Sequence, residues 1–259
     1  MKVVPLKYTF NTRDLGGLKG KDGRLIKSNK LFRSGSLHKL SEEDIQTLIN
    51  ENIKVVVDFR SEKEFIHKAD VKIDGITYIN LPALPKDDRD GKGKHADSNL
   101  LWLVNKESGG KKLLMNTYKN MLLTEEGKAA FKGFFKVLME NNDGAILWHC
   151  SQGKDRAGMA TYLLEYALGV SEEDRVNDYM LTNIAMEKKI KQLTPIVLKE
   201  SSGDYSLLPS LKDVFSADID YLNEALNSIN ETYGSIDNLL LNELEVDIKL
   251  LQEKYLESK

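Results

Sequence analysis

Apolar and polar positions alternate in short blocks through the first two thirds of the chain. β-Branched and other apolar runs predict strands at 3–10, 25–33, 53–59, 76–81 and 145–148. Apolar residues at helical spacing predict helices between and after these runs, at 41–49, 61–65, 112–122 and 127–140. In the last of these helices the apolar face is aromatic, and we interpret it as core packing: Phe131, Phe134, Phe135 and Leu138.

The final third of the chain shows helical periodicity almost throughout. Helices are predicted at 159–168, 172–184, 186–198, 211–231, 237–241 and 245–256. Strands and helices that alternate first, followed by helices alone, indicate an α/β fold with a central sheet flanked by helices. The length of 259 residues fits a single domain over 1–259, whose helical C-terminal part covers 171–259.

Composition and charge narrow the function classes. A net charge of −3 gives no case for nucleic-acid binding. No stretch approaches the about 20 apolar residues that a membrane span needs, so no transmembrane segment is predicted. The first residues lack a long apolar core and a small-residue cleavage site, and we predict no signal peptide. The expected location is the cytoplasm, or outside the cell after removal of a leader. The oligomeric state leaves no signal in the sequence.

The most informative segment is 148–160, which contains the only cysteine, Cys150, and an arginine after five intervening residues, Arg156. An apolar run leads in and a helix-forming run leads out, which predicts a strand, a tight loop and a helix. Such a loop directs backbone N–H groups and a helix N-terminus at one bound anion. Positive potential there favours a thiolate, and a guanidinium can hold two phosphate oxygens. The predicted phosphate-binding residues are Ser151, Gln152, Gly153, Lys154, Asp155 and Arg156.

The remaining chemistry is sparse. One cysteine forbids an internal disulfide and provides no second, resolving thiol, which argues against arsenate reductases and disulfide oxidoreductases. The four histidines are scattered without ligand spacing, so neither a metal nor another cofactor is predicted. His149, beside the cysteine, is a supporting residue in one interpretation and a satisfied core histidine in the other. Gly153 and Gly158 fit a tight turn and close backbone approach.

The string His-Cys-x5-Arg resembles the protein tyrosine phosphatase superfamily. The fuller string His149-Cys-x-x-Gly-Lys-Asp-Arg-x-Gly158 is similar to the bacterial tyrosine/serine phosphatase family, which includes secreted mycobacterial and Listeria enzymes acting on phosphotyrosine and phosphoinositides. Further matches span the chain in the family's order: 11–17, 31–35, 57–61 with Glu64, and 233–237.

This resemblance implies a tyrosine-phosphatase-like fold and a metal-independent phosphomonoesterase. Cys150 would be the nucleophile and Arg156 the clamp on the transferred phosphoryl group. His149 and Arg60 would support the site. The general acid is left open between Asp155, inside the loop, and Asp58, which ends a strand. The acidic run Asp87-Asp88-Asp90 is a third source, although a solvated charge cluster explains it as well.

Two positions in the loop modify this expectation. Lys154 adds charge where further phosphates or an acidic head group could bind, and a lysine here accompanies phosphoinositide activity in the resembled family. Relatives commonly place Thr or Ser after the arginine, where this chain has Ala157. That hydroxyl is thought to stabilise the departing thiolate, so its absence predicts slower turnover but the same reaction.

A lid over the site is a further hypothesis. Residues 82–104 combine a Pro-, Gly- and Asp-rich loop with an apolar patch at 100–104 that we expect to be exposed, and helical insertions cover the active site in the resembled family. The basic helix at 186–198 is a second lid candidate, and an ordinary surface loop and helix are the alternative.

Three functions remain open from the sequence. The first is a phosphatase acting on phosphotyrosine, with phosphoserine and phosphothreonine as further substrates. The second is a phosphoinositide or inositol-phosphate phosphatase, and the third is a weakly catalytic phospho-binding module. Either a phosphorylated protein or a phosphoinositide is the expected substrate. Rhodanese-type sulfur transfer also uses a loop cysteine but does not account for the other matches.

Overall fold

A mixed sheet lies at the centre of the computed structural model, which describes residues 2–85, 100–104 and 110–258, the side chain of Trp102 excepted. Within these residues the sheet has six strands in the order β1-β2-β3-β6-β4-β5. Their bounds are β1 (Lys2–Val3), β2 (Arg13–Asp14), β3 (Leu31–Ser34), β4 (Ile53–Asp58), β5 (Thr77–Asn80) and β6 (Ala145–His149). Strands β3, β6, β4 and β5 pair in parallel, so their carboxyl ends meet at one edge of the sheet.

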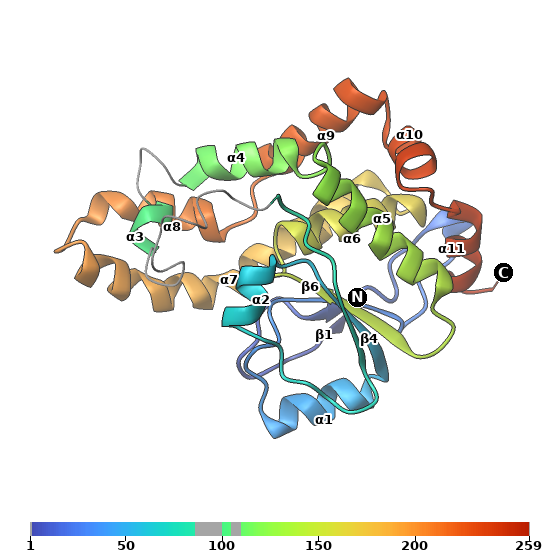
Figure 1. Ribbon diagram of the computed structural model, residues 1–259, viewed down its shortest axis with the longest axis horizontal. Coiled ribbons are helices and arrows are strands. Elements are labelled where there is room, and N and C mark those ends of the chain that lie inside the picture. The colour runs from blue at the N-terminus through green and yellow to red at the C-terminus, as the bar shows by residue number, and fades with distance from the viewer. Residues whose placement is uncertain (1, 86–99, 105–109, 259) are drawn as a thin grey trace.

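Helices cover both faces of this sheet (Figure 1). Their bounds are α1 (Glu42–Asn50), α2 (Glu62–His67), α3 (Leu100–Val104), α4 (Gly110–Asn120), α5 (Glu125–Glu140), α6 (Arg156–Ala167), α7 (Glu172–Glu200), α8 (Leu208–Phe215), α9 (Ile219–Tyr233), α10 (Ile236–Asn238) and α11 (Ile248–Tyr255). Shorter turns are η1 (Lys21–Gly23), η3 (Tyr205–Leu207) and η4 (Leu239–Glu243). The predicted α/β class, a mixed sheet flanked by helices, is confirmed.

Three apolar clusters hold these elements together. The largest joins one face of the sheet to α5 and α6, and it buries the predicted aromatic face of α5 completely. A second lies under the opposite face against α1, as the placement of that helix in Figure 1 shows. The third joins α3, α8 and the C-terminal half of α7, a unit that we call the helical lobe. Its buried members are Val104, Met186, Val197, Leu211, Val214 and Phe215.

The helices predicted at 41–49 and 61–65 are present as α1 and α2, and each begins with a capping box. The Ser41 hydroxyl accepts from the Asp44 N–H while the Asp44 carboxylate accepts from the Ser41 N–H. Ser61 and Glu64 do the same for α2. The strand predicted at 53–59 is β4, and that predicted at 76–81 is β5.

The predicted N-terminal strands are too long. The run at 3–10 is strand only as far as Val3, because Pro5 has no N–H for a sheet hydrogen bond and Asn11 takes a positive φ of 64°. The run at 25–33 is strand only from Leu31, since Asn29, with φ of 59°, turns the chain just before it.

Two helix boundaries in the last third were also wrongly predicted. The helices expected at 172–184 and 186–198 are one helix, α7, because no Gly or Pro breaks the chain near 185. The helix expected at 211–231 is instead two, α8 and α9. Asp218 separates them, because its side chain caps α9 by accepting from the Asp220 N–H at 2.9 Å.

The lid hypothesis for 82–104 falls largely on residues 86–99, which lie outside those that the structure describes. The expected exposure of the apolar patch at 100–104 is wrong for the side chains described there. Val104 is fully buried, and Leu100 and Leu101 are partly buried in the helical lobe. None of the helices in the described ranges is long and apolar enough to cross a membrane.

Candidate active site

Cys150 directly follows β6 at the carboxyl edge of the sheet, and α6 begins at Arg156. The predicted strand, loop and helix are therefore present, and the cysteine is 1% exposed. Gly153 turns the loop with φ of 65°, and a Cβ there would lie 2.4 Å from the Ser34 carbonyl oxygen. Only glycine fits such a turn pressed against a neighbouring strand.

The N-terminal residues support this loop from behind. The Gly153 carbonyl oxygen accepts from the Asn11 amide at 2.9 Å and from the Arg33 guanidinium at 2.7 Å. The Ser151 carbonyl oxygen accepts from the Ser36 N–H at 3.4 Å. Because the loop carbonyls bond backward, its N–H groups are free to face an anion on the opposite side. The sequence matches at 11–17 and 31–35 thus contain residues that support the loop.

A buried carboxylate on α7 holds these supporting arginines in place. Asp178 accepts from Arg13 Nε at 2.8 Å and from Arg33 Nη1 at 2.7 Å, and all three side chains are at most 4% exposed. Burial by itself would raise the pKa of Asp178, but the charges of Arg13 and Arg33 outweigh it and lower that pKa. The loop that follows Cys150 is therefore connected through charged groups to α7.

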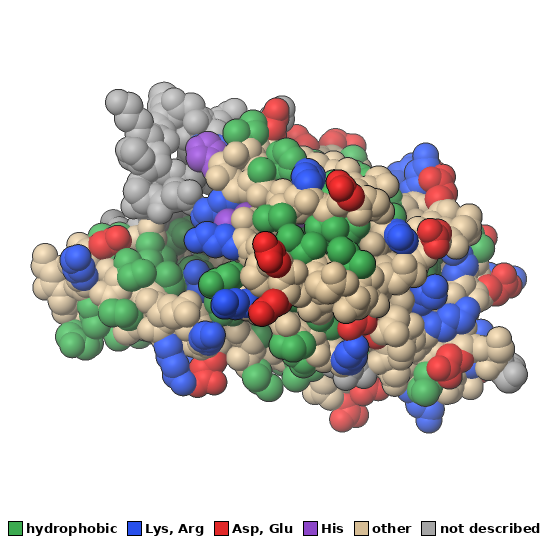
Figure 2. Space-filling view, turned by 90° about the horizontal axis from the view of Figure 1, so that it is seen from below, with side chains coloured by type: hydrophobic (Ala, Val, Ile, Leu, Met, Phe, Trp, Pro, Cys, Tyr) green, Lys and Arg blue, Asp and Glu red, His purple; other side chains and the backbone are tan. Residues whose placement is uncertain are grey.

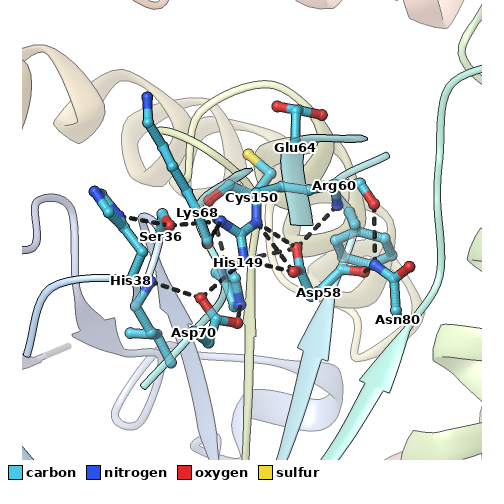
Figure 3. Close-up of polar contacts among 12 residues, drawn as sticks. Ser36, His38, Asp58, Arg60, Glu64, Lys68, Asp70, Asn80, His149 and Cys150 are labelled. Atoms are coloured by element: carbon cyan, nitrogen blue, oxygen red, sulfur yellow. Dashed lines mark hydrogen bonds and ion pairs between the residues drawn. The ribbon is translucent and has the colours of Figure 1, made fainter. Parts of the chain in front are cut away.

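A second buried network lies directly under Cys150, as Figure 3 shows. Arg60 donates to both oxygens of Asp58, at 2.7 to 3.0 Å, and to Asp70 at 2.8 Å. His149 Nε2 lies 2.9 Å from the other oxygen of Asp70. Two carboxylates thus face one guanidinium and one imidazole, and each of the four side chains is at most 5% exposed.

Both ring nitrogens of His149 face acceptors. Nε2 meets the Asp70 carboxylate, and Nδ1 lies 3.2 Å from the carbonyl oxygen of Cys150. Only the doubly protonated ring donates to both. Burial by itself would lower the pKa of His149, but the charge of Asp58 and the hydrogen bond to Asp70 outweigh it and raise that pKa. The contacts of both ring nitrogens and the raised pKa thus favour the protonated imidazole behind Cys150.

The same network accounts for the position of Asp58 and for the only group of possible metal ligands among the described residues. Asp58, Asp70 and His149 offer ligand atoms within 4.8 Å of one another, a feature that histidine spacing alone did not reveal. The Arg60 guanidinium already bonds both carboxylates, so this side chain supplies the positive charge that a metal ion would bring. Asp58 is 3% exposed, with both oxygens bonded to Arg60, a geometry that leaves no free oxygen to protonate a substrate.

Arg156 points its guanidinium at Glu64 on α2. Nη1 lies 2.7 Å from Glu64 Oε2 and Nη2 lies 3.1 Å from Oε1, and the Ser151 hydroxyl also donates to Glu64. Burial by itself would lower the pKa of Arg156, but the charges of Glu64 and Cys150 raise it. For the Glu64 carboxylate burial has the opposite effect and by itself would raise the pKa. The charge of Arg156 and its hydrogen bond outweigh burial, and the pKa of Glu64 is lowered. This pairing orients the guanidinium over the loop.

Lys154 and Asp155 turn toward the helices rather than toward Arg156. The Lys154 side chain is completely buried, and its ammonium donates to the backbone carbonyl oxygens of Val214 and Ser216. Asp155 Oδ1 lies 3.2 Å from that ammonium and is itself buried, while the Asp155 side chain as a whole is 20% exposed. The open position expected for Lys154, facing further phosphates, is not the one that the structure has.

The sequence alone did not assign roles to Glu64 and Asp70. Glu64 was noted only as part of a family match, and its capping-box spacing predicts a helix start but not a partner 92 positions away. Asp70 belongs to no motif. Its burial beside a histidine 79 positions later depends on the path of the chain after α2, which local sequence patterns do not record.

Curated relatives are similar over nearly the whole chain. A provisionally named tyrosine-protein phosphatase of Cupriavidus necator is 28% identical over 95% of this chain and 85% of its own length. The triple specificity protein phosphatase PtpB of Mycobacterium tuberculosis is 27% identical over 93% of both chains. A solved structure of a P. aeruginosa TpbA variant with phosphotyrosine covers 89% of this chain at 11% identity, with a TM-score of 0.31.

The model of the tyrosine phosphatase family matches residues 4–257, which include all of the loop, its supports and the helices behind it. The predicted enzyme class, a hydrolase of the protein-tyrosine-phosphatase type, is confirmed by this match and by the relatives. The chain belongs to the tyrosine phosphatase family.

Proposed function

We propose that this protein hydrolyses phosphotyrosine, and also phosphoserine and phosphothreonine, through a cysteinyl-phosphate intermediate on Cys150. The observation that carries the proposal is the loop itself. Cys150 lies at the sheet edge and Arg156 at the first turn of α6, with the loop carbonyls bonded from behind. That arrangement provides a nucleophile, an anion cradle and a guanidinium for one phosphoryl group.

The reaction has two steps. The Cys150 thiolate attacks phosphorus, and an S–P bond forms while the bond to the leaving oxygen breaks and that oxygen takes a proton from the general acid. Water then attacks phosphorus, the S–P bond breaks, and the former acid takes the proton from water. Inorganic phosphate leaves and the thiolate is regenerated. Arg156 and the loop N–H groups hold the equatorial oxygens in both steps.

In this proposal three positive groups favour the thiolate. The imidazolium of His149 lies behind Cys150, held by Asp70. The N-terminus of α6 lies in front of it with its partial positive charge. Arg156 adds a full charge from the other end of the loop. In this proposal the role of Arg60 is indirect, because it fixes Asp58 and Asp70 and so orients His149.

We assign the general acid to Asp155 rather than Asp58. Asp155 lies in the loop with its side chain 20% exposed and its buried Oδ1 without a hydrogen bond, whereas Asp58 is buried with both oxygens bonded to Arg60. The third source, Asp87-Asp88-Asp90, lies outside the described residues. A proton donor must reach the leaving oxygen, and an accessible carboxylate meets that requirement better than a saturated one.

A basic cluster beside the loop favours a second function, dephosphorylation of phosphoinositides. Burial first, and then the charges of Lys68 and Lys39, lower the pKa of Lys189 on α7, so these ammonium groups lie close enough to repel. The same two lysines, after burial, lower the pKa of His38. Figure 2 shows Lys and Arg side chains gathered where the helical lobe meets the body of the protein.

This basic cluster is tied to the catalytic loop. Ser36, two residues before His38, donates its N–H to the Ser151 carbonyl oxygen, and Arg60 donates to the Lys68 carbonyl oxygen at 2.8 Å. An anion among these ammonium groups relieves their repulsion. A substrate with a second phosphate near the one being cleaved, such as an inositol phospholipid head group, fits that requirement.

The test is phosphate release, without added metal, from phosphotyrosine, phosphoserine/phosphothreonine and phosphoinositide substrates, with Cys150→Ser beside the wild type. We expect release to disappear in Cys150→Ser. Release that persists in that variant would overturn the cysteine mechanism. Absence of both steady release and a stoichiometric burst would identify a phospho-binding module instead.

The substrate panel also decides between the two functions. Lys189→Met should raise KM for phosphoinositides by about tenfold, which is the effect of losing one charge-assisted hydrogen bond. KM for the phosphotyrosine peptide should not change. Lys188→Met, which removes a neighbouring exposed charge from α7, is the matched control. Equal behaviour of the two variants would remove the support for the lipid substrate.

A further inference from the structure

Lys154 is a buried ammonium in the middle of the catalytic loop. Its side chain is 0% exposed, and Nζ lies 2.7 Å from the Val214 carbonyl oxygen and 3.1 Å from that of Ser216. The third polar neighbour is Asp155 Oδ1 at 3.2 Å, and the Tyr221 ring centroid lies 5.6 Å away. A buried charge persists only when it is paired in this way, so the position of this side chain is closely defined.

The two carbonyls belong to the end of α8. Val214 is in its last turn and Ser216 is its C-cap, where helix carbonyls lack intrahelical partners and carry partial negative charge. Lys154 therefore fastens the catalytic loop to the C-terminus of a helix 60 positions later in the chain. Since α8 contributes Leu211, Val214 and Phe215 to the third apolar cluster, this contact also fastens the loop to the helical lobe.

Asp155 lies between this ammonium and a group of tyrosines. The hydroxyl groups of Tyr118 on α4 and Tyr179 on α7 form a hydrogen bond, with their oxygens 2.9 Å apart. Burial first, and then the charge of Asp155, raise the pKa values of both. Tyr221 of α9 lies close enough that Asp155 contributes to its raised pKa as well, after burial and two other carboxylates. Tyrosine hydroxyls and the Lys154 ammonium thus lie around the carboxylate, and the Arg156 guanidinium also interacts with its charge.

We propose that Lys154 is a positioning residue, which aims the Asp155 carboxylate by linking it to the end of α8 and does not contact the substrate phosphate. The inference rests on the proposed role of Asp155 as general acid. Lys154 provides the only full positive charge that the ion pairs of the described residues give to Asp155. Without it, the carboxylate would lose its fixed partner and move within the space between the tyrosines and the loop.

The experiment compares Lys154→Met with the wild type on two substrates. One is an aryl phosphate whose leaving group is an acidic phenol, and the other is a phosphoserine peptide. An acidic phenol leaves without much help, whereas a serine hydroxyl requires a proton from the general acid. We expect Lys154→Met to lower kcat on the phosphoserine peptide by about 10- to 100-fold and on the acidic aryl phosphate by under about threefold, within the usual range of general-acid catalysis. KM should change for neither.

Two further variants complete the design. Lys212→Met removes an exposed lysine from the same helix, α8, and should match the wild type on both substrates. Asp155→Asn should show the same leaving-group dependence, and Lys154→Met should add little to it in the double variant, because both act on one group. If Lys154→Met does not fold, Lys154→Gln, which keeps a donor, replaces it.

Each outcome separates the inference from the function beneath it. A leaving-group effect in Asp155→Asn but none in Lys154→Met overturns the inference and leaves the acid assignment standing. No such effect in Asp155→Asn overturns the acid assignment and the inference together. A higher KM for a doubly phosphorylated substrate with unchanged kcat in Lys154→Met would show that Lys154 is a phosphate ligand, which also overturns the inference.

Discussion

The two ends of the catalytic loop are held in different ways. At the Cys150 end, the loop rests on two carboxylates, Asp58 and Asp70, that face the Arg60 guanidinium and the His149 imidazole, all within or next to the sheet. At the other end, Lys154 reaches backbone carbonyls at the end of α8, and within the described residues it forms an ion pair only with Asp155, its neighbour in the chain. One support is a closed set of charged side chains, and the other depends on where a helix ends.

This difference separates two parts of the chemistry. The polar surroundings of Cys150 are set by strand pairing, because Asp58 and His149 lie in register on β4 and β6. The placement of Asp155 is instead set by how the helical lobe packs. We therefore expect substitutions in the helical lobe to impair proton transfer to the leaving group more strongly than they affect the Cys150 thiolate.

Removing the central cation of the first support should have the largest effect on stability. Arg60→Met leaves Asp58 and Asp70 buried without their guanidinium, which typically costs about 3–5 kcal/mol. Lys154→Met removes an ammonium whose partners are mostly neutral carbonyls, and about 1–3 kcal/mol is expected. Urea unfolding of both variants measures the two losses. Equal losses would show that the two ends do not differ in the way described.

Sequence reasoning reached further at the first end than at the second for one physical reason. Cys150 and Arg156 stand out by side-chain type and spacing, and the family resemblance pointed to Asp58 as a candidate acid and to Arg60 and His149 as supporting residues. The partners of Lys154 are carbonyl oxygens, which every residue has, so no pattern marks Val214 or Ser216 as a binding point. An exposed, phosphate-facing lysine was the expectation that local sequence allowed.

The fold shows the same limit. The sheet and the helices beside it follow from apolar periodicity and capping residues such as Ser41 and Ser61. The boundary between α8 and α9 was missed because the apolar spacing continues across it, although Asp218 is a helix-capping type. Asp70 had no local signal, since only the folded chain brings it to His149.

The charge on His149 predicts a pH dependence of smaller size. Its pKa is raised in the folded protein, so the stability from its contacts with Asp58 and Asp70 is fully present below the unfolded value of about 6.5. That stability is lost as the pH rises through the folded pKa. The free energy of unfolding should therefore fall from pH 7 upward in the wild type, and less so in His149→Gln.

Two features isolate this effect. The pKa of His38 is lowered by burial and by Lys68, so His38 is neutral above pH 7 in both states and adds no slope there. Asp70, whose pKa stays low although burial opposes it, is ionised in both states over that range. A parallel pH dependence in wild type and His149→Gln would mean that His149 is neutral in the folded protein.

The smallest expected effect concerns Ala157, next to the arginine at the helical end of the loop. A hydroxyl there would stabilise the thiolate as water breaks the S–P bond, so Ala157→Thr should raise steady-state turnover by up to about tenfold, the scale of one charge-assisted hydrogen bond. Thr161, one turn later, cannot replace it, because its hydroxyl already donates to the Ala157 carbonyl oxygen and accepts from Trp148.

Ala157→Val is the matched control, because valine has nearly the shape of threonine without the hydroxyl and so tests for crowding at this fully buried position. A gain in Thr but not in Val assigns the effect to the hydroxyl. Unchanged or lower turnover in a folded Ala157→Thr would mean that breakdown of the phosphoenzyme does not limit the rate, and that the first step, with Asp155 and its support from Lys154, limits it instead.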